Sequence, residues 1–286
     1  MKNLKLCMTI LVRDEAALIR ENLDYHLSRG VDFIIATDNC SQDGTATILR
    51  EYEKKGLLHY IFEPADDYSQ DLWVTRMARI AAEEYKADWI MHTDADEFWW
   101  PSNSEKIPDI LGSVAPNIDG LKVRRSNFAP TDGYDNELPF YSQLTVREKH
   151  SLNSLGRPLP PKICHRGRPD VKINQGNHSF ELHSQTPCVK QCNEILIFHF
   201  PQRGFNEFQK RVRQGGAAYN RNNRLAKNVG NTWRKLYQLE QRGELKNYFD
   251  GATFSEEQIT QGISENTLIV DTRLSDYMQK MRQTKP

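Results

Sequence analysis

The chain has 286 residues, which is enough for one large α/β domain or for one domain with an accessory segment. A hydrophobic fraction of 38% and a mean hydropathy of −0.69 are typical of a polar but foldable protein, and 13 Pro and 16 Gly are too few for a disordered one. Because the formal net charge is zero, we expect no nucleic-acid partner. Five scattered cysteines and the absence of an apolar run near ~20 residues predict a soluble, cytoplasmic protein.

The first hundred residues alternate two hydrophobic patterns. Short apolar runs predict buried strands at 4–12, 31–37, 57–62 and 87–93. Between them, apolar residues at three- and four-residue spacing predict three helices, which include residues 16–27, 45–55 and 73–81. This β-α-β-α-β-α-β order predicts an α/β fold with a mostly parallel central sheet flanked by helices.

The pattern is less regular after residue 101. Short strands are predicted at 120–125, 171–173, 179–182 and 195–200, and loops are expected to dominate 126–169. From Gly204 the chain turns helical, and residues 201–249 carry eleven Lys and Arg against three Glu. This basic segment has three open interpretations: an anion clamp over the donor diphosphate or an acidic glycan, contact with anionic lipid or nucleic acid, or the solvated face of long helices.

Three polar clusters follow the predicted strands: Arg13-Asp14-Glu15, Asp38-Asn39 and Asp94-Ala95-Asp96. Since ligands of parallel sheets bind beyond the carboxyl ends of the strands, we expect these clusters to share one edge. Two carboxylates one residue apart after a buried strand are suited to a hard divalent cation such as Mn²⁺ or Mg²⁺. A plain acidic turn is the alternative.

The order and spacing of four motifs resemble family 2 glycosyltransferases, in particular a family 2-like branch related to family 92. These motifs are Thr9 to Glu15, Gly30-Val31-Asp32, Asp38 to Thr45 and Asp94 to Phe98. The resemblance implies a GT-A fold, in which a Rossmann-like nucleotide-binding half is joined to an acceptor-binding half. It also implies a nucleotide-sugar donor, with a UDP-sugar favoured, and Mn²⁺ or Mg²⁺. The expected domains are then a GT-A domain at 1–200, with halves at 1–100 and 101–200, and a C-terminal helical extension at 201–286.

The same resemblance assigns roles to residues of the expected donor site. Arg13 and Glu15 would line the base and ribose pocket, and Asp38 and Asn39 would hold the nucleoside. Arg76 would contact the donor. Asp94 would hold the ribose and the metal, with Asp96 as the more direct metal ligand. His199, which follows an apolar run, is the candidate for a further metal ligand, with a core histidine as the alternative.

The catalytic base is not identified by a motif. His178 follows a Gly176-Asn177 turn and is the preferred candidate, with Glu181, His183 and Glu194 as others. A retaining enzyme would need no such base, and the sequence leaves the stereochemistry open.

The expected function is therefore metal-assisted, non-processive transfer of a sugar to a glycan or lipid-linked saccharide. A sugar-nucleotide pyrophosphorylase is one alternative, although the first loop lacks the glycines of that class. A catalytically decayed glycan- or nucleotide-binding protein is the other. Peripheral contact with the inner membrane face through residues 203–246 stays open.

Overall fold

The computed structural model describes residues 4–102, 104–226 and 228–284. The chain divides into two compact units, each made of two segments. Unit 1 contains Met1–Arg125 and Pro160–Ile197, and unit 2 contains Ser126–Leu159 and Phe198–Pro286. This division differs from the domains expected from sequence, because residues 126–159 join the C-terminal segment rather than the preceding strands.

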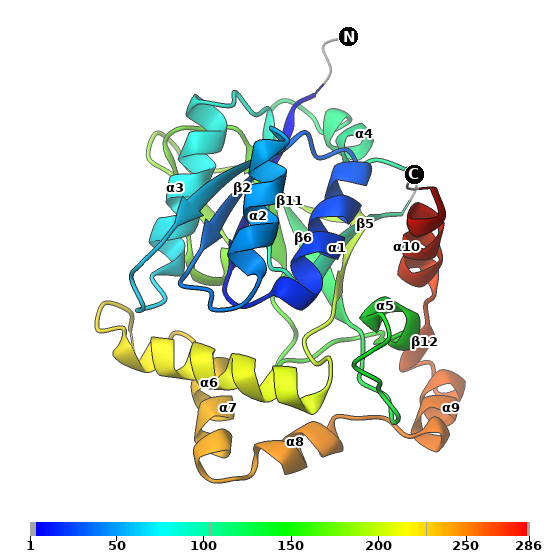
Figure 1. Cartoon of the computed structure of the whole chain (residues 1–286). Helices are drawn as coiled ribbons and strands as arrows, with labels where there is room; N and C mark the ends of the chain where they lie inside the picture. Colours follow the sequence, from blue (N-terminus) through cyan, green and yellow to red (C-terminus); the bar gives the residue numbers. More distant parts are fainter. Residues whose placement is uncertain (1–3, 103, 227, 285–286) are drawn as a thin grey trace. The chain divides into compact units, whose positions relative to one another are not determined.

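Unit 1 is built on an eight-stranded sheet of order β3-β2-β1-β4-β8-β6-β11-β5 (Figure 1). Its strands are β1 (Leu6–Val12), β2 (Phe33–Asp38), β3 (Leu58–Phe62), β4 (Trp89–Thr93), β5 (Glu97–Pro101), β6 (Gly120–Asn127), β8 (Lys162–Arg166) and β11 (Val189–His199). Strands β3, β2, β1 and β4 pair in parallel, whereas β8 pairs antiparallel with both β4 and β6.

Alternate residues of β1 face the two sides of the sheet. Met8 and Ile10 pack in one core cluster with residues of α1 (Ala16–Ser28) and α2 (Thr45–Lys54), such as Leu23 and Leu49. Cys7 packs in the opposite cluster with Val74, Met77, Ala78 and Ala81 of α3 (Gln70–Glu83). Figure 1 shows α1 and α2 side by side in front of the sheet. The two-residue period of the strand therefore decides which helix covers which face.

The remaining elements of unit 1 are short. Helix α4 (Ile107–Gly112) adds Ile107 and Leu111 to the first core cluster. The antiparallel pair β9 (Val171–Ile173) and β10 (Phe180–Leu182) packs on the α3 side, and the single turn η1 (Gln175–Asn177) joins its strands.

Unit 2 is mainly helical. It contains α5 (Phe140–Gln143), α6 (Phe205–Arg221), α7 (Asn231–Gln241), α8 (Leu245–Gly251), α9 (Glu256–Ser264) and α10 (Arg273–Thr284), with an antiparallel pair formed by β7 (Val146–Glu148) and β12 (Leu268–Val270). Phe208, Val212, Leu236, Leu245 and Phe249 form a core between α6, α7 and α8. The pairing of β7 with β12 ties residues 126–159 to the C-terminal segment.

The predicted fold class is confirmed: the chain is α/β, with parallel strands flanked by helices and a helical C-terminal region. The strands predicted at 171–173 and 179–182 form the β9–β10 pair, and those at 120–125 and 195–200 form parts of β6 and β11. The stretch at 126–169, for which loops are predicted, also contains α5, β7 and β8. No helix within the described residues is long and apolar enough to cross a membrane.

Many cations of the basic segment bind groups of unit 2 itself. Arg213 forms an ion pair of 2.5 Å with Glu240, and Arg234 donates to the Tyr219 carbonyl oxygen. Lys235 donates to the Ser154 carbonyl oxygen at 2.6 Å. These contacts use part of the excess positive charge to hold α6 and α7 in place. Lys227 belongs to the same segment but lies outside the described residues.

Gly167 is expected to be essential for the fold. A Cβ atom at this position would lie 1.8 Å from the backbone oxygen of Ala87, which cannot move aside as a side chain can. We expect Gly167→Ala to lower the free energy of unfolding by roughly 3 kcal/mol, measured by urea denaturation. Gly112→Ala is the matched control, because a Cβ added there would have no atom within 4 Å and the backbone φ is not positive. Equal stability of the two variants would contradict the prediction.

Candidate functional site

The three polar clusters follow strands whose ends are aligned. In the parallel register, Val12 of β1 pairs with Asp38 of β2, and Ile10 of β1 pairs with Thr93 of β4. Arg13, Asp38 and Asp94 therefore leave the sheet at the same edge, as the sequence predicts. This edge is the position where parallel α/β sheets bind their ligands.

The cluster after β2 is fixed by hydrogen bonds. Asp38 is buried, and its carboxylate accepts from the Tyr60 hydroxyl at 2.9 Å and from the Ser41 backbone N–H at 3.1 Å. Burial and the Asp38 carboxylate raise the pKa of Tyr60 to about 12, so the phenol stays protonated as a donor. The Asn39 side chain donates to the carbonyl oxygens of Glu63 and Ala65 at 3.1 and 2.6 Å. Asn39 thus holds the segment after β3 beside the end of β2.

Arg13 and Arg76 are the two arginines predicted to contact the donor. Each forms an ion pair with a carboxylate of the loop between β3 and α3. Arg13 binds Asp66 at 2.5 Å, and Arg76 of α3 binds Glu63 at 2.9 Å. The Arg76 side chain is about two-fifths exposed, so water screens this pair. Glu15 precedes α1, and its backbone N–H donates to the Thr45 hydroxyl at 2.9 Å. These contacts orient the rim of the sheet edge, and the donor-binding roles of these residues stay predictions.

The turn from Asp94 to Glu97 joins β4 to β5 and is held by a buried amide. Asn22 of α1 has no exposed surface, and its side-chain N–H groups donate to the carbonyl oxygens of Ala95 and Glu97, both at 2.9 Å. The Asp94 backbone N–H also donates to the Glu97 carboxylate at 3.2 Å. The backbone of the acidic turn is therefore fixed by α1 through Asn22.

A buried ion cluster lies under this turn. Glu97 has 0% and Lys162 1% of the side chain exposed. The Lys162 ammonium donates to Asp94 Oδ2 at 2.6 Å and lies 3.6 Å from Glu97 Oε2. The Arg125 guanidinium donates to Glu97 Oε1 at 3.1 Å. A buried carboxylate is tolerated only with such partners, because removing a charge from water costs several kcal/mol.

Glu97 titrates near neutrality. Burial raises its pKa to about 7, while Lys162 lowers it and the neighbouring Asp94 carboxylate raises it. Asp94 differs in its access to solvent, since 36% of its side chain is exposed, whereas Asp96 is 1% exposed. Of the three acidic side chains of the turn, Asp94 is therefore the one most open to solvent.

His178 lies close to this cluster. Its Nδ1 donates to the carbonyl oxygen of Pro161 at 2.8 Å when that nitrogen carries the proton. Burial lowers its pKa to about 3, and the positive charges of Lys162 and Arg125 act in the same direction. The imidazole is therefore neutral at physiological pH. Gly176, with φ +83°, makes room for the ring, because a Cβ there would lie 2.6 Å from it.

Two further candidates from the sequence, Glu181 and His199, have different surroundings. Glu181 of β10 is more than half exposed and pairs with Lys172 of β9 at 3.2 Å, so it lies on the open face of a hairpin. His199 belongs to unit 2, where its Nδ1 lies 2.7 Å from Asn127 Oδ1. The roles predicted for Glu181 and His199 stay predictions.

Three residues of the site belong to none of the sequence motifs: Asn22, Arg125 and Lys162. Asn22 lies within a helical apolar stripe, and Lys162 lies in a stretch expected to be loop. Within the described residues, no three His, Cys, Asp or Glu side chains are grouped so that they could hold a metal ion. The paired carboxylates of Asp94 and Asp96 would thus need oxygen ligands from a substrate to complete a coordination shell, as Mg²⁺ sites in proteins commonly do.

Comparison with known proteins identifies the class. The family model for glycosyltransferase family 92 matches residues 2–166, which is more than half of the chain. The chain therefore belongs to glycosyltransferase family 92, and the predicted resemblance to the branch related to this family is confirmed.

Individual relatives are more distant. A family 92 protein of Oryza sativa subsp. japonica is 27% identical over 130 residues, which cover 44% of this chain and 22% of that protein. The match thus spans about a fifth of the length of this curated relative. The crystal structure of S. aureus TarS 1-349 is 12% identical with a TM-score of 0.44, covering 99% of this chain and 92% of that chain. Glucosyl-3-phosphoglycerate synthase from Mycobacterium tuberculosis, solved with Mn²⁺ and UDP, is 16% identical with a TM-score of 0.30, covering 42% and 44%.

The pKa of Glu97 predicts a pH-dependent stability. Because the folded-state pKa of about 7 exceeds the ordinary value of 4.5, the folded chain holds this proton more tightly than the unfolded chain. This contribution to stability is fully present below pH ~4.5 and is lost as the pH rises through ~7. We expect the wild type to lose stability relative to Glu97→Gln between about pH 5 and 8, measured by urea unfolding. Glu181→Gln is the exposed control. An equal difference in stability between wild type and Glu97→Gln at about pH 5 and pH 8 would contradict the raised pKa of Glu97.

Removing the buried Lys162 ammonium tests the same ion cluster through its cation. Lys162→Met leaves two carboxylates without their shared cation, and we expect a loss of roughly 3–5 kcal/mol at about pH 8. The loss should be smaller at about pH 5, where Glu97 binds a proton. The exposed control Lys172→Met should cost less than about 1 kcal/mol. A cost for Lys162→Met that adding Glu97→Gln does not reduce would show that the two groups are not coupled.

Proposed function

We propose that this chain transfers a sugar from a nucleotide-sugar donor to a hydroxyl of a glycan or lipid-linked saccharide. The observation that carries the proposal is the alignment of Asp38 and Asp94-Ala95-Asp96 at the carboxyl edge of the parallel strands, in a chain of glycosyltransferase family 92. A UDP-sugar is the donor that we favour, and transfer of single sugars is the mode. The acceptor class rests on the family resemblance of the motifs.

The donor would be held by the residues of the sheet edge. Asp38 is fixed by Tyr60 and the Ser41 N–H, so its carboxylate is already oriented before a ligand arrives. Arg13 and Arg76 bring two positive charges to the same edge, and each is held by one carboxylate. A preorganised site of this kind loses little conformational entropy when a nucleotide binds.

The acidic turn fits a divalent cation by its chemistry. Asp94 and Asp96 offer hard carboxylate oxygens, the ligands that Mn²⁺ and Mg²⁺ prefer. A bound Mn²⁺ or Mg²⁺ would supply neutralisation of the diphosphate that leaves with the nucleoside. Lys162 and Asn22 keep Asp94 and the turn backbone in place for this role.

His178 is our candidate for the proton acceptor if the reaction inverts the anomeric carbon. With Nδ1–H bound to the Pro161 carbonyl oxygen, the lone pair lies on Nε2. The ring stays neutral beside Lys162 and Arg125, so it can accept a proton, although a pKa of about 3 makes it a weak base. Glu181 is less suited, because it lies on an exposed strand bound to Lys172.

We propose a cytoplasmic location, with the basic segment at 203–246 available for peripheral contact with anionic lipid. The support is the excess of positive charge in the sequence of this segment. Arg242, directly after α7, is exposed. Arg213, Arg234 and Lys235 already bind groups of unit 2, so they would add less to such a contact.

Thermal unfolding with nucleotides tests the proposed function. UDP, GDP, CDP and dTDP are each added with Mn²⁺ or with EDTA, and a ligand at ~100 times its dissociation constant should stabilise by about 2.7 kcal/mol. For a chain of this size, each kcal/mol of stabilisation raises the thermal midpoint by roughly 2–4 °C. We expect a shift with UDP that is lost in EDTA and in Asp96→Ala. The control variant Asp276→Ala removes an exposed carboxylate of α10 and should retain the shift.

A shift with another nucleotide would correct the donor but keep the reaction class. A shift that persists in EDTA and in Asp96→Ala would contradict the metal role of the acidic turn. The absence of any shift in a folded sample would favour a decayed binding protein over an enzyme.

A further inference from the structure

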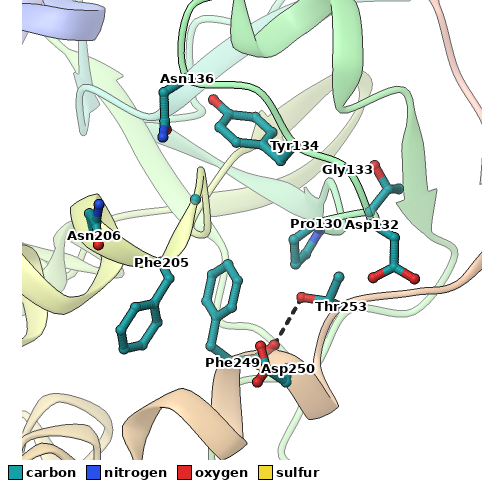
Figure 2. Close-up of a pocket in the computed structure, with 12 residues that line it drawn as sticks. Pro130, Asp132, Gly133, Tyr134, Asn136, Phe205, Asn206, Phe249, Asp250 and Thr253 are labelled. Atoms are coloured by element: carbon teal, nitrogen blue, oxygen red, sulfur yellow. Dashed lines mark hydrogen bonds between the residues drawn. The ribbon is translucent and has the colours of Figure 1, made fainter.

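Unit 2 contains a pocket of its own. Its volume is about 420 Å³, within the usual range of ~300–1,000 Å³ for ligand sites. The lining comes from three segments far apart in the sequence: residues 130–136, the start of α6 at 204–206, and residues 249–253 at the end of α8 (Figure 2). All three belong to unit 2, so the pocket is defined without reference to unit 1.

Backbone contacts hold the walls together before any ligand binds. Thr131 and Phe254 form a β-bridge, and hydrogen bonds join Phe254 N–H to the Pro130 oxygen and Asp132 N–H to the Phe254 oxygen. Gly204, with φ +78°, lies against Asn136 and Tyr134, since a Cβ there would meet them at 2.9 and 3.3 Å. The first and third segments are thus tied directly, and the start of α6 packs on the first.

Aromatic rings supply the apolar part of the pocket. Phe205 and Phe249 pack edge to face with ring centres 5.6 Å apart, and the half-buried Tyr134 also lines the opening. In Figure 2, Phe249 is drawn between Phe205 and Pro130, with Tyr134 above them in this view. Phe249 belongs to the buried core of unit 2, so the accessible ring surface comes from Tyr134 and Phe205, and such a surface can pack against the C–H face of a sugar.

Polar side chains surround the same space. Asp132, Asn136 and Asn206 are exposed, and within the described part of the chain their side chains form no hydrogen bond. The start of α6 adds backbone N–H groups, because a helix has no internal acceptors for its first turn and Gly204 offers no capping side chain. Carboxylate, amide and N–H groups together can bind hydroxyl groups both as acceptors and as donors.

The charges of the lining exclude an anionic ligand. The twelve lining residues include Asp132 and Asp250 but no Lys, Arg or His. Lys246 is next to the pocket, but its ammonium is paired with Asp250 and lies 5.4 Å from the Phe205 ring centre. Carboxylates in a lining without a cation would repel a diphosphate. Arg203 lies near Tyr134, but its guanidinium donates to the Phe200 carbonyl oxygen. The acidic lining therefore favours a neutral polyhydroxylated ring over the nucleotide part of a donor.

We propose that this pocket of unit 2 binds a neutral saccharide. The ring packs on the aromatic side chains, and its hydroxyls bind Asp132, Asn136 and Asn206. Its role as the acceptor site rests on the proposed function, which requires a second, sugar-shaped substrate besides the nucleotide donor. Saccharide binding itself requires only the pocket.

Saturation-transfer NMR on the full chain, without nucleotide, tests the proposal. The probes are the methyl glycosides of glucose, galactose, mannose and N-acetylglucosamine, with glucuronic acid as the anionic comparison. We expect at least one neutral probe to bind the wild type more tightly than glucuronic acid. Asn206→Ala and Asp132→Ala should weaken its binding by about tenfold, because each removes a hydrogen-bonding group. Both residues are exposed, so the thermal midpoint should not change.

Asn247→Ala is the matched control, since Asn247 is an exposed asparagine of α8 outside the lining. It should bind the probe as the wild type does. Failure of every neutral probe to bind, equal binding by all variants, or tighter binding of glucuronic acid would overturn the proposal. The nucleotide-induced thermal shift is measured on the same samples. A nucleotide-induced shift without saccharide binding would refute only the proposed saccharide site. Saccharide binding without such a shift would refute only the proposed function.

Discussion

The candidate site depends on the need to neutralise one buried carboxylate. Glu97 is fully enclosed and is bound by Arg125 and approached by Lys162, and the same ammonium holds Asp94. The sheet topology makes this possible. The parallel strands end in the acidic turn, while β8 runs antiparallel to β4 and therefore begins at that edge with Lys162. Strand β6 is antiparallel to β8, so Arg125 near its end reaches the same place. Asp94 directly follows the parallel strand β4, Glu97 is the first residue of β5, and β8 and β6 supply the cations Lys162 and Arg125.

This arrangement gives the acidic turn two separate tasks. The inner carboxylate, Glu97, anchors the turn within the fold, and its pKa near 7 reflects burial that its cations only partly offset. The outer carboxylate, Asp94, keeps about a third of its side chain in contact with solvent while Lys162 fixes its direction. A cation that binds Asp94 would therefore meet a carboxylate that Lys162 already orients. The motif thus combines a buried ion cluster, centred on Glu97, with a partly exposed carboxylate at Asp94.

The second unit adds a site of opposite character. The pocket between residues 130–136, 204–206 and 249–253 has aromatic walls and carboxylates but no cation in its lining. The sheet edge of unit 1, in contrast, carries Arg13 and Arg76 beside its acidic groups. Under the proposed function, the sheet edge would bind a charged donor and the pocket a largely uncharged acceptor, and their different charges would help to distinguish the two.

The sequence by itself determined the parallel strands, the helices that cover them and the edge at which Asp38 and Asp94 meet. Those features depend on hydrophobic period and on strand direction, and both can be read locally. Only the tertiary structure decided that Lys162 and Arg125 would neutralise Glu97, that Asn22 would hold the turn, and that residues 126–159 would join the C-terminal helices. These outcomes depend on pairings between distant parts of the chain, such as Lys162 with Asp94, 68 positions away, and β7 with β12. The residues around Lys162 in the sequence do not indicate its partners, because strand pairing and burial bring it to Asp94 and Glu97.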